Sequence, residues 1–425
     1  MKILLITDNY LPESNPPSLR CSEHAQAWVE AGHDVEVVTS FPNFPDGRVF
    51  AGYRQSLWLK EEVDGVRLLR VPTIVFPNKG TLLRIIDQLS FMLTGGIGAL
   101  FRQRPDVLIA TSPQMFTAVA GWFAAKVLRC PFVLEIRDLW PDSIVAVGAM
   151  KESFAIAMLR KLEIFLYKAA HSIIVVTDSF RDNLVSRGIP PEKIFTITNG
   201  VKICNLRKQA DGGALRARYA IENRIVVSYI GTVGMAHGLE LVLDAAVAIA
   251  PVRPEIVFMI VGSGAELEEL REKASALGLE NVIFTGRVDH EEIGSYWDAS
   301  DMTLVLLRDT PLFRTVIPSK IFEALGMGVP IITNVSGEVD RILADTGSAV
   351  LAPPSDLHSV VQAIERLAAD AGLRAQMADA ALTLSATYDR ERLALCLVDT
   401  LCSKLRLTEG NVSAVVQESR DLKRD

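Results

Sequence analysis

Short runs of apolar and β-branched residues alternate with helix-length amphipathic segments along nearly the whole chain. This alternation is typical of α/β proteins, whose parallel strands are buried on both faces of the sheet. One series of strand-like runs occupies residues 2–7, 34–39, 66–71, 107–111, 132–136, 172–176 and 194–197. A second series occupies residues 225–230, 257–261, 282–284, 302–306, 330–333 and 349–351. The sequence therefore predicts two doubly wound, Rossmann-like domains.

The length of the chain agrees with two domains, because 425 residues exceed what one hydrophobic core usually serves. The polar stretch 202–213, with Gly212 and Gly213, is the predicted linker. We therefore place the amino domain at 1–203 and the carboxyl domain at 204–387. Open α/β sheets bind ligands beyond the carboxyl ends of their strands, so two such domains predict a cleft between them. Hinge closure of this cleft would exclude water from a reaction.

Composition excludes several classes of protein. A net charge of −7 argues against nonspecific binding of nucleic acid. Residues 1–200 carry a net charge of +1 and residues 201–425 one of −8, so the amino half would approach anionic lipid head groups more easily. The five cysteines form no CxxC pair, which indicates reduced thiols in the cytoplasm and no zinc site. The apolar start at 1–6 is too short for a signal-peptide core.

The longest uncharged apolar stretch is 89–101, flanked by basic and acidic residues. It is shorter than the roughly 18 residues that a membrane-spanning helix needs. A helix of this length is either part of a core or lies at a membrane surface, and the sequence leaves both possibilities open.

The strongest chemical signal is the stretch PSKIFEALGMGVPIITN at 318–334. A Pro-Ser-Lys turn leads into a short predicted helix that carries Glu323. Ser319 and Lys320 at the start of that helix, with its exposed backbone N–H groups, suit a phosphate. Glu323 could bind ribose hydroxyls, although a solvated helix carboxylate is the alternative. The stretch predicts a nucleotide-sugar site.

Glycine turns after other strands of the second series could complete this site. Glycines at 231–234 allow the backbone to approach a diphosphate, and a plain strand-to-helix turn is the alternative. The turn at 262–264 has the same two explanations. Arg287 could contact phosphate or pair with Asp289. The candidate donor-binding residues at these turns are Thr232, Gly234, Gly262, Gly264, Arg287 and Val288.

Candidates on the amino side are fewer. Arg20 and His24 lie one helical turn apart, and Arg20 could reach an anionic acceptor or simply face solvent. Arg137 and Asp138 follow a predicted strand, where polar residues of α/β enzymes tend to be functional. Asp138 could hold an acceptor hydroxyl, pair with Arg137 or cap the turn.

Four segments in order resemble the family 4 retaining glycosyltransferases. They are SFPNFPDG at 40–47, IRDLWPDS at 136–143, YIGTVGMAHGLE at 229–240, and the stretch at 318–334. The sequence is most similar to a subgroup of O-antigen, capsule and colanic-acid enzymes that includes N-acetyl-L-fucosamine transferases. The resemblance implies the GT-B fold, with the last helix crossing back so that about 388–425 joins the amino domain.

The resemblance also implies an activity. A sugar, such as an N-acetylamino or deoxy-amino sugar, would pass with retention from a UDP-sugar to a polyprenyl-diphosphate-linked saccharide, with no cofactor and no metal. The family is usually described by front-face attack, in which the leaving diphosphate accepts the acceptor's proton. Lys320, Asp138 and His237 are the candidate catalytic residues. The protein would be cytoplasmic, either free or peripheral on the cytoplasmic face of the inner membrane through its amino domain.

The chain departs from the family pattern at several positions. Relatives often have arginine at the position of Thr232, lysine at that of His237 and glutamate at that of Thr315. Diphosphate charge would then be met by backbone amides, Lys320, Arg287 or His237. Pro16 and Pro17 replace the family's paired glycines and predict a stiffer turn.

Two rival functions stay open at this stage. A nucleotide-sugar epimerase of the same architecture would act on the donor alone, and a non-catalytic subunit would only bind sugar nucleotide or lipid. A dinucleotide dehydrogenase is disfavoured, because no GxGxxG follows the first strand.

Overall fold

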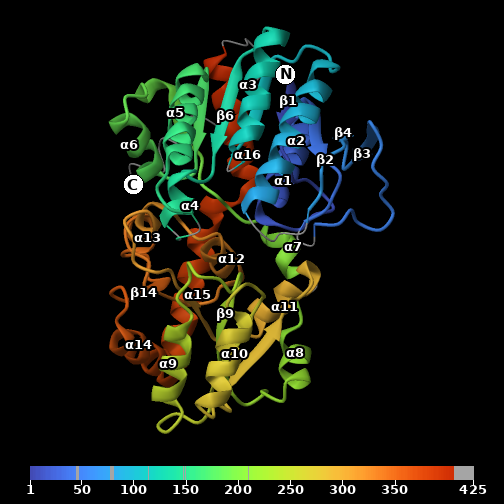
Figure 1. Cartoon of the computed structure of the whole chain (residues 1–425). Coiled ribbons are helices and arrows are strands. Elements are labelled where there is room, and N and C mark those ends of the chain that lie inside the picture. The colour runs from blue at the N-terminus through green and yellow to red at the C-terminus, as the bar shows by residue number, and fades with distance from the viewer. Residues whose placement is uncertain are drawn as a thin grey trace.

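The computed structural model describes residues 1–44, 47–76, 81–112, 114–146, 148, 150–208 and 210–405. These residues form two α/β domains, one above the other in Figure 1. Part of the predicted turn at 40–47 and the polar tail at 408–425 lie outside the described residues.

The amino domain is built on an eight-stranded sheet of order β3-β4-β2-β1-β5-β6-β7-β8. The strands are β1 (Lys2–Ile6), β2 (Asp34–Ser40), β3 (Leu59–Val63), β4 (Val66–Val71), β5 (Val107–Thr111), β6 (Phe132–Ile136), β7 (Ser172–Val175) and β8 (Ile194–Thr196). All neighbours pair in parallel except β3, which forms an antiparallel hairpin with β4. The sequence did not predict β3, because its residues LKEEV are mostly charged.

Side chains of alternating direction give this sheet two apolar faces. Leu4 and Ile6 of β1 enter one buried cluster, and Ile3 and Leu5 enter another. The first cluster includes side chains of α2 (Thr81–Leu100), α3 (Met115–Leu128), α5 (Phe154–Ala169) and α6 (Asp178–Ser186). The second includes side chains of α1 (Pro16–Glu30) and α16 (Arg390–Lys404). The short helix α4 (Asp142–Ala146) follows β6, and the 3-10 turn η1 (Pro191–Lys193) precedes β8.

Helix α1 begins at Pro16, inside the segment for which the sequence predicted a stiff turn. The side chain of Asn15 accepts a hydrogen bond from the Ser18 amide at 2.9 Å and caps the helix. Pro16 and Pro17 therefore occupy the first turn of α1, where their missing N–H groups have no intrahelical partner to lose. They are part of a helix and do not form the separate stiff turn that we expected.

The carboxyl domain is built on a six-stranded parallel sheet of order β11-β10-β9-β12-β13-β14. The strands are β9 (Ile225–Ile230), β10 (Ile256–Val261), β11 (Val282–Gly286), β12 (Met302–Val305), β13 (Ile331–Thr333) and β14 (Ala349–Leu351). Its helices are α9 (Glu240–Ile249), α10 (Leu267–Ala276), α11 (Ile293–Asp298), α12 (Lys320–Met327), α13 (Glu338–Leu343), α14 (Leu357–Ala369) and α15 (Ala371–Ser385). The 3-10 turns are η2 (His290–Glu292), η3 (Phe313–Thr315) and η4 (Ala386–Tyr388). The two predicted Rossmann-like domains are confirmed.

The predicted linker is mostly helical. It contains α7 (Ile203–Arg207), and the two glycines begin α8 (Gly212–Arg218). A Cβ at Gly212 would lie 2.6 Å from the carbonyl carbon of Asp298. This glycine therefore permits close packing of α8 and does not make a loose connection.

The chain crosses between the domains a second time just before α16. In Figure 1 this last helix runs beside α1 of the amino domain. The Trp28 indole of α1 donates to the Ala394 carbonyl of α16 at 2.8 Å. The two crossings lie side by side, because the Val201 amide donates to the Tyr388 carbonyl at 3.0 Å and the Arg390 amide donates to that of Val201 at 3.2 Å.

Among the described residues, no helix has the length and apolar content to cross a membrane. The apolar stretch at 89–101 forms the second half of α2 and continues to Phe101. Phe91 and Ala99 are buried under the sheet, whereas Leu93 and Ile97 are exposed. One side of α2 therefore packs in the core, as the first possibility expected. The second possibility, contact with a membrane surface, concerns the exposed side of the same helix.

Candidate functional site

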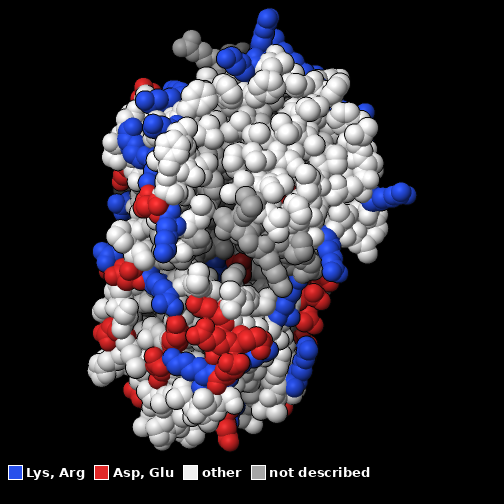
Figure 2. Space-filling model, viewed as in Figure 1, with Lys and Arg blue, Asp and Glu red and all other residues white. Residues whose placement is uncertain are grey.

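A site between the domains is favoured by the strand order of both sheets. The order reverses between β1 and β5 in one sheet and between β9 and β12 in the other. Ligands of open α/β sheets bind at such reversal points, beyond the carboxyl ends of the strands. Figure 2 shows the molecule hollowed between the two domains. A cavity of about 590 Å³ there is lined from both sides, by Asp142, Val145, Arg160, Thr310, Pro311 and Leu312.

Lys320 is the most unusual residue at the reversal point of the carboxyl domain. It is the first residue of α12, and its side chain is buried. The amine Nζ has no hydrogen-bond partner and lies 3.8 Å from the centre of the Tyr229 ring, a cation–π distance. Burial lowers the pKa of this amine to about 7, although the charge of Glu323 acts in the opposite direction.

Glycine at position 231 makes room for this lysine. A Cβ at Gly231 would lie 2.8 Å from Lys320 Nζ, and its φ of +144° favours glycine. The Tyr229 hydroxyl donates to the Thr232 carbonyl at 2.6 Å and holds the loop after β9 against its own strand. The loop and α12 together enclose one buried amine that has no hydrogen-bond partner.

His237 lies beside the same tyrosine, 5.9 Å between ring centres. Burial, and then the charge of Lys320, lower the pKa of His237 to about 4, so its ring is neutral at pH 7. Its Nδ1 lies 3.3 Å from the Leu306 carbonyl, which can only accept. Nδ1 therefore carries the proton and Nε2 is an acceptor. This differs from our expectation that His237 could supply positive charge to a diphosphate.

Glu323 follows Lys320 by one helical turn. The buried indole of Trp297 in α11 donates to its carboxylate oxygen Oε2 at 3.1 Å. Burial raises the pKa of this carboxyl, and the Trp297 hydrogen bond partly offsets the effect. Ser319, just before the helix, makes no side-chain capping bond.

The other predicted donor-binding residues lie after β9, β10 and β11 and have two different roles. A Cβ at Gly262 would lie 1.9 Å from the Gly231 carbonyl oxygen, and one at Gly264 would lie 2.1 Å from that of Val233. These glycines allow two strand-end loops to touch, and the Val233 amide donates to the Ser263 carbonyl at 3.0 Å. Thr232, Gly234, Arg287 and Val288 all have some exposure to solvent.

Arg308 is a cation of this region that the sequence reasoning missed. It follows β12, and its Nε donates to the Met235 carbonyl at 2.6 Å. Its Nη2 pairs with Glu240 at 2.9 Å and with Glu266 at 3.8 Å. Its position after a strand at the reversal point was the signal that could have identified it.

Two predicted acceptor-side residues are buried parts of the amino domain. Arg20 Nε pairs with Glu135 at 2.9 Å, and its other nitrogens donate to the carbonyls of Ile197 and Thr198 and to the Asn199 side chain. His24 is buried beside Trp28, and burial, then the charge of Arg20, hold its pKa well below the ordinary value. The Arg20 side chain ties α1 to β6, and His24 is buried on the same face of α1.

Arg137 and Asp138 follow β6 as predicted. Arg137 Nε donates to the Ser112 carbonyl at 2.8 Å and Nη1 to that of Pro17 at 3.2 Å, while Nη2 is buried without a partner. Burial raises the pKa of Asp138, opposed by hydrogen bonds from Ser143 and the Leu139 amide.

A polar cluster at the reversal point of the amino domain was not predicted. Gln114, after β5, donates to Asp8 Oδ2 and Asn9 Oδ1, both at 3.2 Å. Asn9 in turn donates to Glu13 Oε2 at 2.8 Å. Burial, and then the charges of Asp87 and Glu13, raise the pKa of Asp8 well above its ordinary value. Asp8 directly follows the first strand, and that position could have identified it.

No group of three or more His, Cys, Asp or Glu side chains suited to a metal occurs in the part of the chain that the structure describes.

Comparisons with known sequences place both domains. Residues 17–200 match the family model described as Glycosyl transferase 4-like domain, and residues 213–383 match Glycosyl transferases group 1. The chain is 26% identical over 379 residues to WcaI of Escherichia coli, a glycosyl transferase named for colanic acid biosynthesis. The match covers 86% of this chain and 92% of that protein. Glycosyltransferase WbjE of Pseudomonas aeruginosa is 24% identical, over 68% of this chain and 73% of its own.

Solved structures share the fold. HepE of Anabaena in complex with UDP matches with a TM-score of 0.69 and 19% identity, over 95% of this chain and all of that one. WaaG, a glycosyltransferase of lipopolysaccharide biosynthesis, matches with a TM-score of 0.65 and 13% identity, over 94% of this chain and 99% of that one.

Proposed function

Because the chain belongs to the glycosyltransferases of the GT-B type, with a glycosyl transferase 4-like domain followed by a group 1 domain, we propose that it transfers a sugar from a UDP-sugar to a lipid-linked saccharide. The product is a bacterial surface polysaccharide such as an O-antigen or capsule, in line with WcaI, which is named for colanic acid biosynthesis. The sugar is an N-acetylamino or deoxy-amino sugar, such as N-acetyl-L-fucosamine. This choice is supported only by the motifs at 40–47, 136–143, 229–240 and 318–334.

The observation that carries the proposal is the buried amine of Lys320. A buried ammonium without a partner is costly, and burial lowers its pKa to about 7. A diphosphate beside it would raise that pKa and provide the missing partner. The glycine loop at 231–234 allows phosphate oxygens to approach the backbone closely.

The ribose and the sugar fit the neighbouring groups. Trp297 occupies one oxygen of Glu323, and the other oxygen can accept from a ribose hydroxyl. Neutral His237 offers Nε2 as an acceptor for a hydroxyl of the transferred sugar. Uracil is the proposed base because the HepE structure holds UDP, a property of that protein which supports the assignment by analogy.

We propose transfer with retention, without a metal and without a cofactor. The bond from the anomeric carbon to the β-phosphate oxygen breaks, and the acceptor oxygen bonds to that carbon on the same face. The acceptor's proton passes to the departing phosphate oxygen. Lys320, as a cation, stabilises the negative charge that grows on the diphosphate.

The acceptor approaches from the amino domain. Asp8, Asn9 and Gln114 offer hydrogen-bonding groups at the reversal point of that sheet, and Asp138 lies after the neighbouring strand β6. The cavity of about 590 Å³ beside α4 and α5 gives a lipid-linked saccharide room to enter. We place the protein in the cytoplasm, with its amino domain at the inner membrane surface.

The experiment is calorimetry with UDP-, GDP- and ADP-sugars, followed by an assay with a polyprenyl-diphosphate saccharide. The proposal expects preferred binding of a UDP-sugar, which Lys320→Met weakens and the exposed Lys273→Met does not. Change of the UDP-sugar without any acceptor would favour an epimerase. Donor binding without any turnover, across a panel of lipid-linked acceptors, would favour a non-catalytic subunit.

A further inference from the structure

The helices that cover one side of the amino domain expose an unusual amount of apolar surface. Leu93, Ile97 and Phe101 follow each other at four-residue intervals along and just after α2, so they lie on one helix face. Leu93 is 61% and Phe101 65% exposed. Phe123 and Val127 are exposed at the same interval on α3, which packs against α2. We call these five residues the apolar face.

Helix α5 extends this surface on the other side of α3. Phe154, Met158 and Phe165 are exposed, Phe154 to 82%, and Lys161 and Lys168 lie on the same side of the helix at intervals of three and four residues. The Phe165 ring contacts Trp122 of α3 edge-on, 5.0 Å between centres. A stripe of apolar and basic residues is typical of helices that lie in a membrane interface.

Carboxylates are scarce on the three helices of this side. Over the described parts of α2, α3 and α5 the carboxylates are Asp87 and Glu163. Glu163 is buried and accepts from Tyr167 and Arg187, and Asp87 lies close enough to influence the buried Asp8. In Figure 2 the front of the amino domain is nearly free of charged groups over α2 and α3, whereas Asp and Glu gather on the carboxyl domain below.

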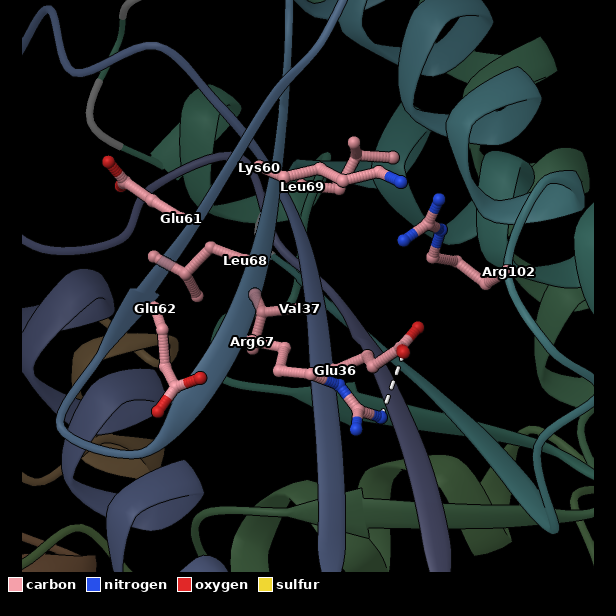
Figure 3. A pocket seen from close by; sticks show the side chains of 9 residues that line it. All are labelled: Glu36, Val37, Lys60, Glu61, Glu62, Arg67, Leu68, Leu69 and Arg102. Carbon is pink, nitrogen blue, oxygen red and sulfur yellow. Dashed lines mark ion pairs between the residues drawn. The ribbon is translucent and has the colours of Figure 1, made fainter.

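A pocket lined by Lys60, Arg67 and Arg102 lies at the edge of the apolar face. Trp58, just before β3, contacts Phe101 with 5.2 Å between ring centres. Beyond this pair, Lys60 and Arg102 line a cavity of about 230 Å³, and in Figure 3 their charged ends point toward one another. The Arg102 nitrogen Nε is buried without a hydrogen-bond partner.

The carboxylates of the same pocket do not neutralise this pair. Glu36 pairs with Arg67 at 2.8 Å, and Glu61 pairs with Arg70 at 2.6 Å. Glu62 is exposed, and in Figure 3 its side chain points away from Lys60 and Arg102. The two cations therefore offer a place for a singly charged phosphate group next to exposed aromatic rings.

We propose that the apolar face and the exposed side of α5 dock onto an anionic phospholipid surface, with a lipid phosphate held by Lys60 and Arg102. This deepens the membrane contact in the proposed function and rests on it. Scattered exposed apolar residues are ordinary, but a contiguous group on adjacent helices marks an interaction surface. The basic groups around it attract a negative lipid surface, whereas they would repel the same basic groups on a second copy of this face.

The test uses the full chain and sedimentation with vesicles of phosphatidylcholine, alone or mixed with phosphatidylglycerol. Binding should require phosphatidylglycerol and weaken as salt rises. Ile97→Ser with Phe101→Ser should weaken binding by at least about tenfold, because apolar area no longer leaves water. The matched control is Val252→Ser with Leu277→Ser, two exposed apolar residues of the carboxyl domain.

The phosphate site has its own variants. Lys60→Ala and Arg102→Ala should each weaken binding to mixed vesicles about fivefold, the factor that corresponds to roughly 1 kcal/mol per cation near such a surface. Lys60 is exposed, so its variant tests the site even if Arg102→Ala unfolds the pocket. Arg218→Ala and Arg366→Ala on the carboxyl domain are the controls and should leave binding unchanged.

Two outcomes would overturn the proposal. One is the absence of binding to mixed vesicles, or binding that the variants of the apolar face leave unchanged. The other is a dimer in sedimentation velocity that the same variants dissociate, since this would assign the face to a second copy of the chain. Donor calorimetry on the same samples separates the two proposals. Failed vesicle binding with intact UDP-sugar binding overturns the membrane contact and leaves the proposed sugar transfer standing. Vesicle binding without any UDP-sugar binding overturns the proposed sugar transfer alone.

Discussion

Replacing Lys320 with methionine should stabilise the fold and at the same time weaken donor binding. Burial lowers the pKa of the amine from 10.5 to about 7. Between these values only the unfolded chain holds the proton, so the wild-type free energy of unfolding rises with pH across this window. At about 1.4 kcal/mol per pKa unit, the lysine destabilises the fold by roughly 4 to 5 kcal/mol below pH 7. Methionine keeps most of the side-chain volume and lacks the charge.

The measurement is urea unfolding of both proteins at several pH values between 7 and 9.5. We expect the variant to be more stable by about 1–3 kcal/mol at pH 7, because the shorter side chain recovers only part of the penalty. The difference should shrink toward pH 9.5 by up to about 1.4 kcal/mol per pH unit. Calorimetry should show UDP-sugar affinity reduced about 10- to 100-fold, since a hydrogen bond to a charged group contributes roughly 1.5–3 kcal/mol.

Lys273→Met is the control for both measurements. Lys273 is exposed and lies 3.8 Å from Asp244, so its replacement should change neither stability nor affinity by more than about 0.5 kcal/mol. A Lys320→Met protein that is less stable than the wild type, and binds UDP-sugar as tightly, would show that the buried amine is structural.

Three further predictions concern other residues of the two domains. Arg20→Met should lower the free energy of unfolding by about 3–5 kcal/mol because Glu135 would stay buried without its cation. The prediction is contradicted if urea unfolding shows a loss of stability as small as that of the surface variant Arg54→Met. Gly264→Ala should destabilise the fold by more than roughly 2 kcal/mol in thermal unfolding, since the new Cβ would lie 2.1 Å from the Val233 carbonyl oxygen. Gly234→Ala, whose Cβ would lie 3.6 Å from its nearest neighbour, should have a small effect. Equal effects of the two variants would argue against the close packing of these loops. Glu323→Gln keeps an acceptor for Trp297 and should preserve stability while lowering UDP-sugar affinity about tenfold. If calorimetry shows that the wild type binds 2′- and 3′-deoxyribose analogues of the UDP-sugar as tightly as the UDP-sugar itself, the ribose contact is rejected.

The strands were predictable because a buried parallel strand needs a short apolar run, and that requirement is local. The edge strand β3 was not predicted because its LKEEV residues are mostly charged. They form backbone hydrogen bonds with β4 but bury few side chains, so no apolar run marks the strand. The start of α1 was misplaced because two prolines looked like a turn, although a helix accepts them in its first turn once Asn15 caps it.

The candidate site was predictable where its chemistry is carried by one segment, as at Ser319, Lys320 and Glu323. The surroundings of Lys320 were not, because Tyr229 and Gly231 lie about ninety residues earlier in the sequence. Arg20 and His24 show the opposite limit. Their spacing gives a shared helix face, but only the ion pair of Arg20 with Glu135 and the burial of His24 show that this face is interior.

The paired chain crossings restrict how the cleft can open. A single connecting segment would let the domains rotate about any axis. Two connecting segments, hydrogen-bonded to each other through Val201, Tyr388 and Arg390, leave one preferred hinge axis. Arg390 reinforces them by pairing with Glu23 of α1 at 2.5 Å. Motion is then confined to rotation about the line through both crossings, and this rotation would change the width of the cavity lined by Asp142 and Thr310. Cutting the chain before α16 would remove the second covalent connection between the domains. The domains could then rotate about more than one axis, and closure would no longer align the two halves of the cleft.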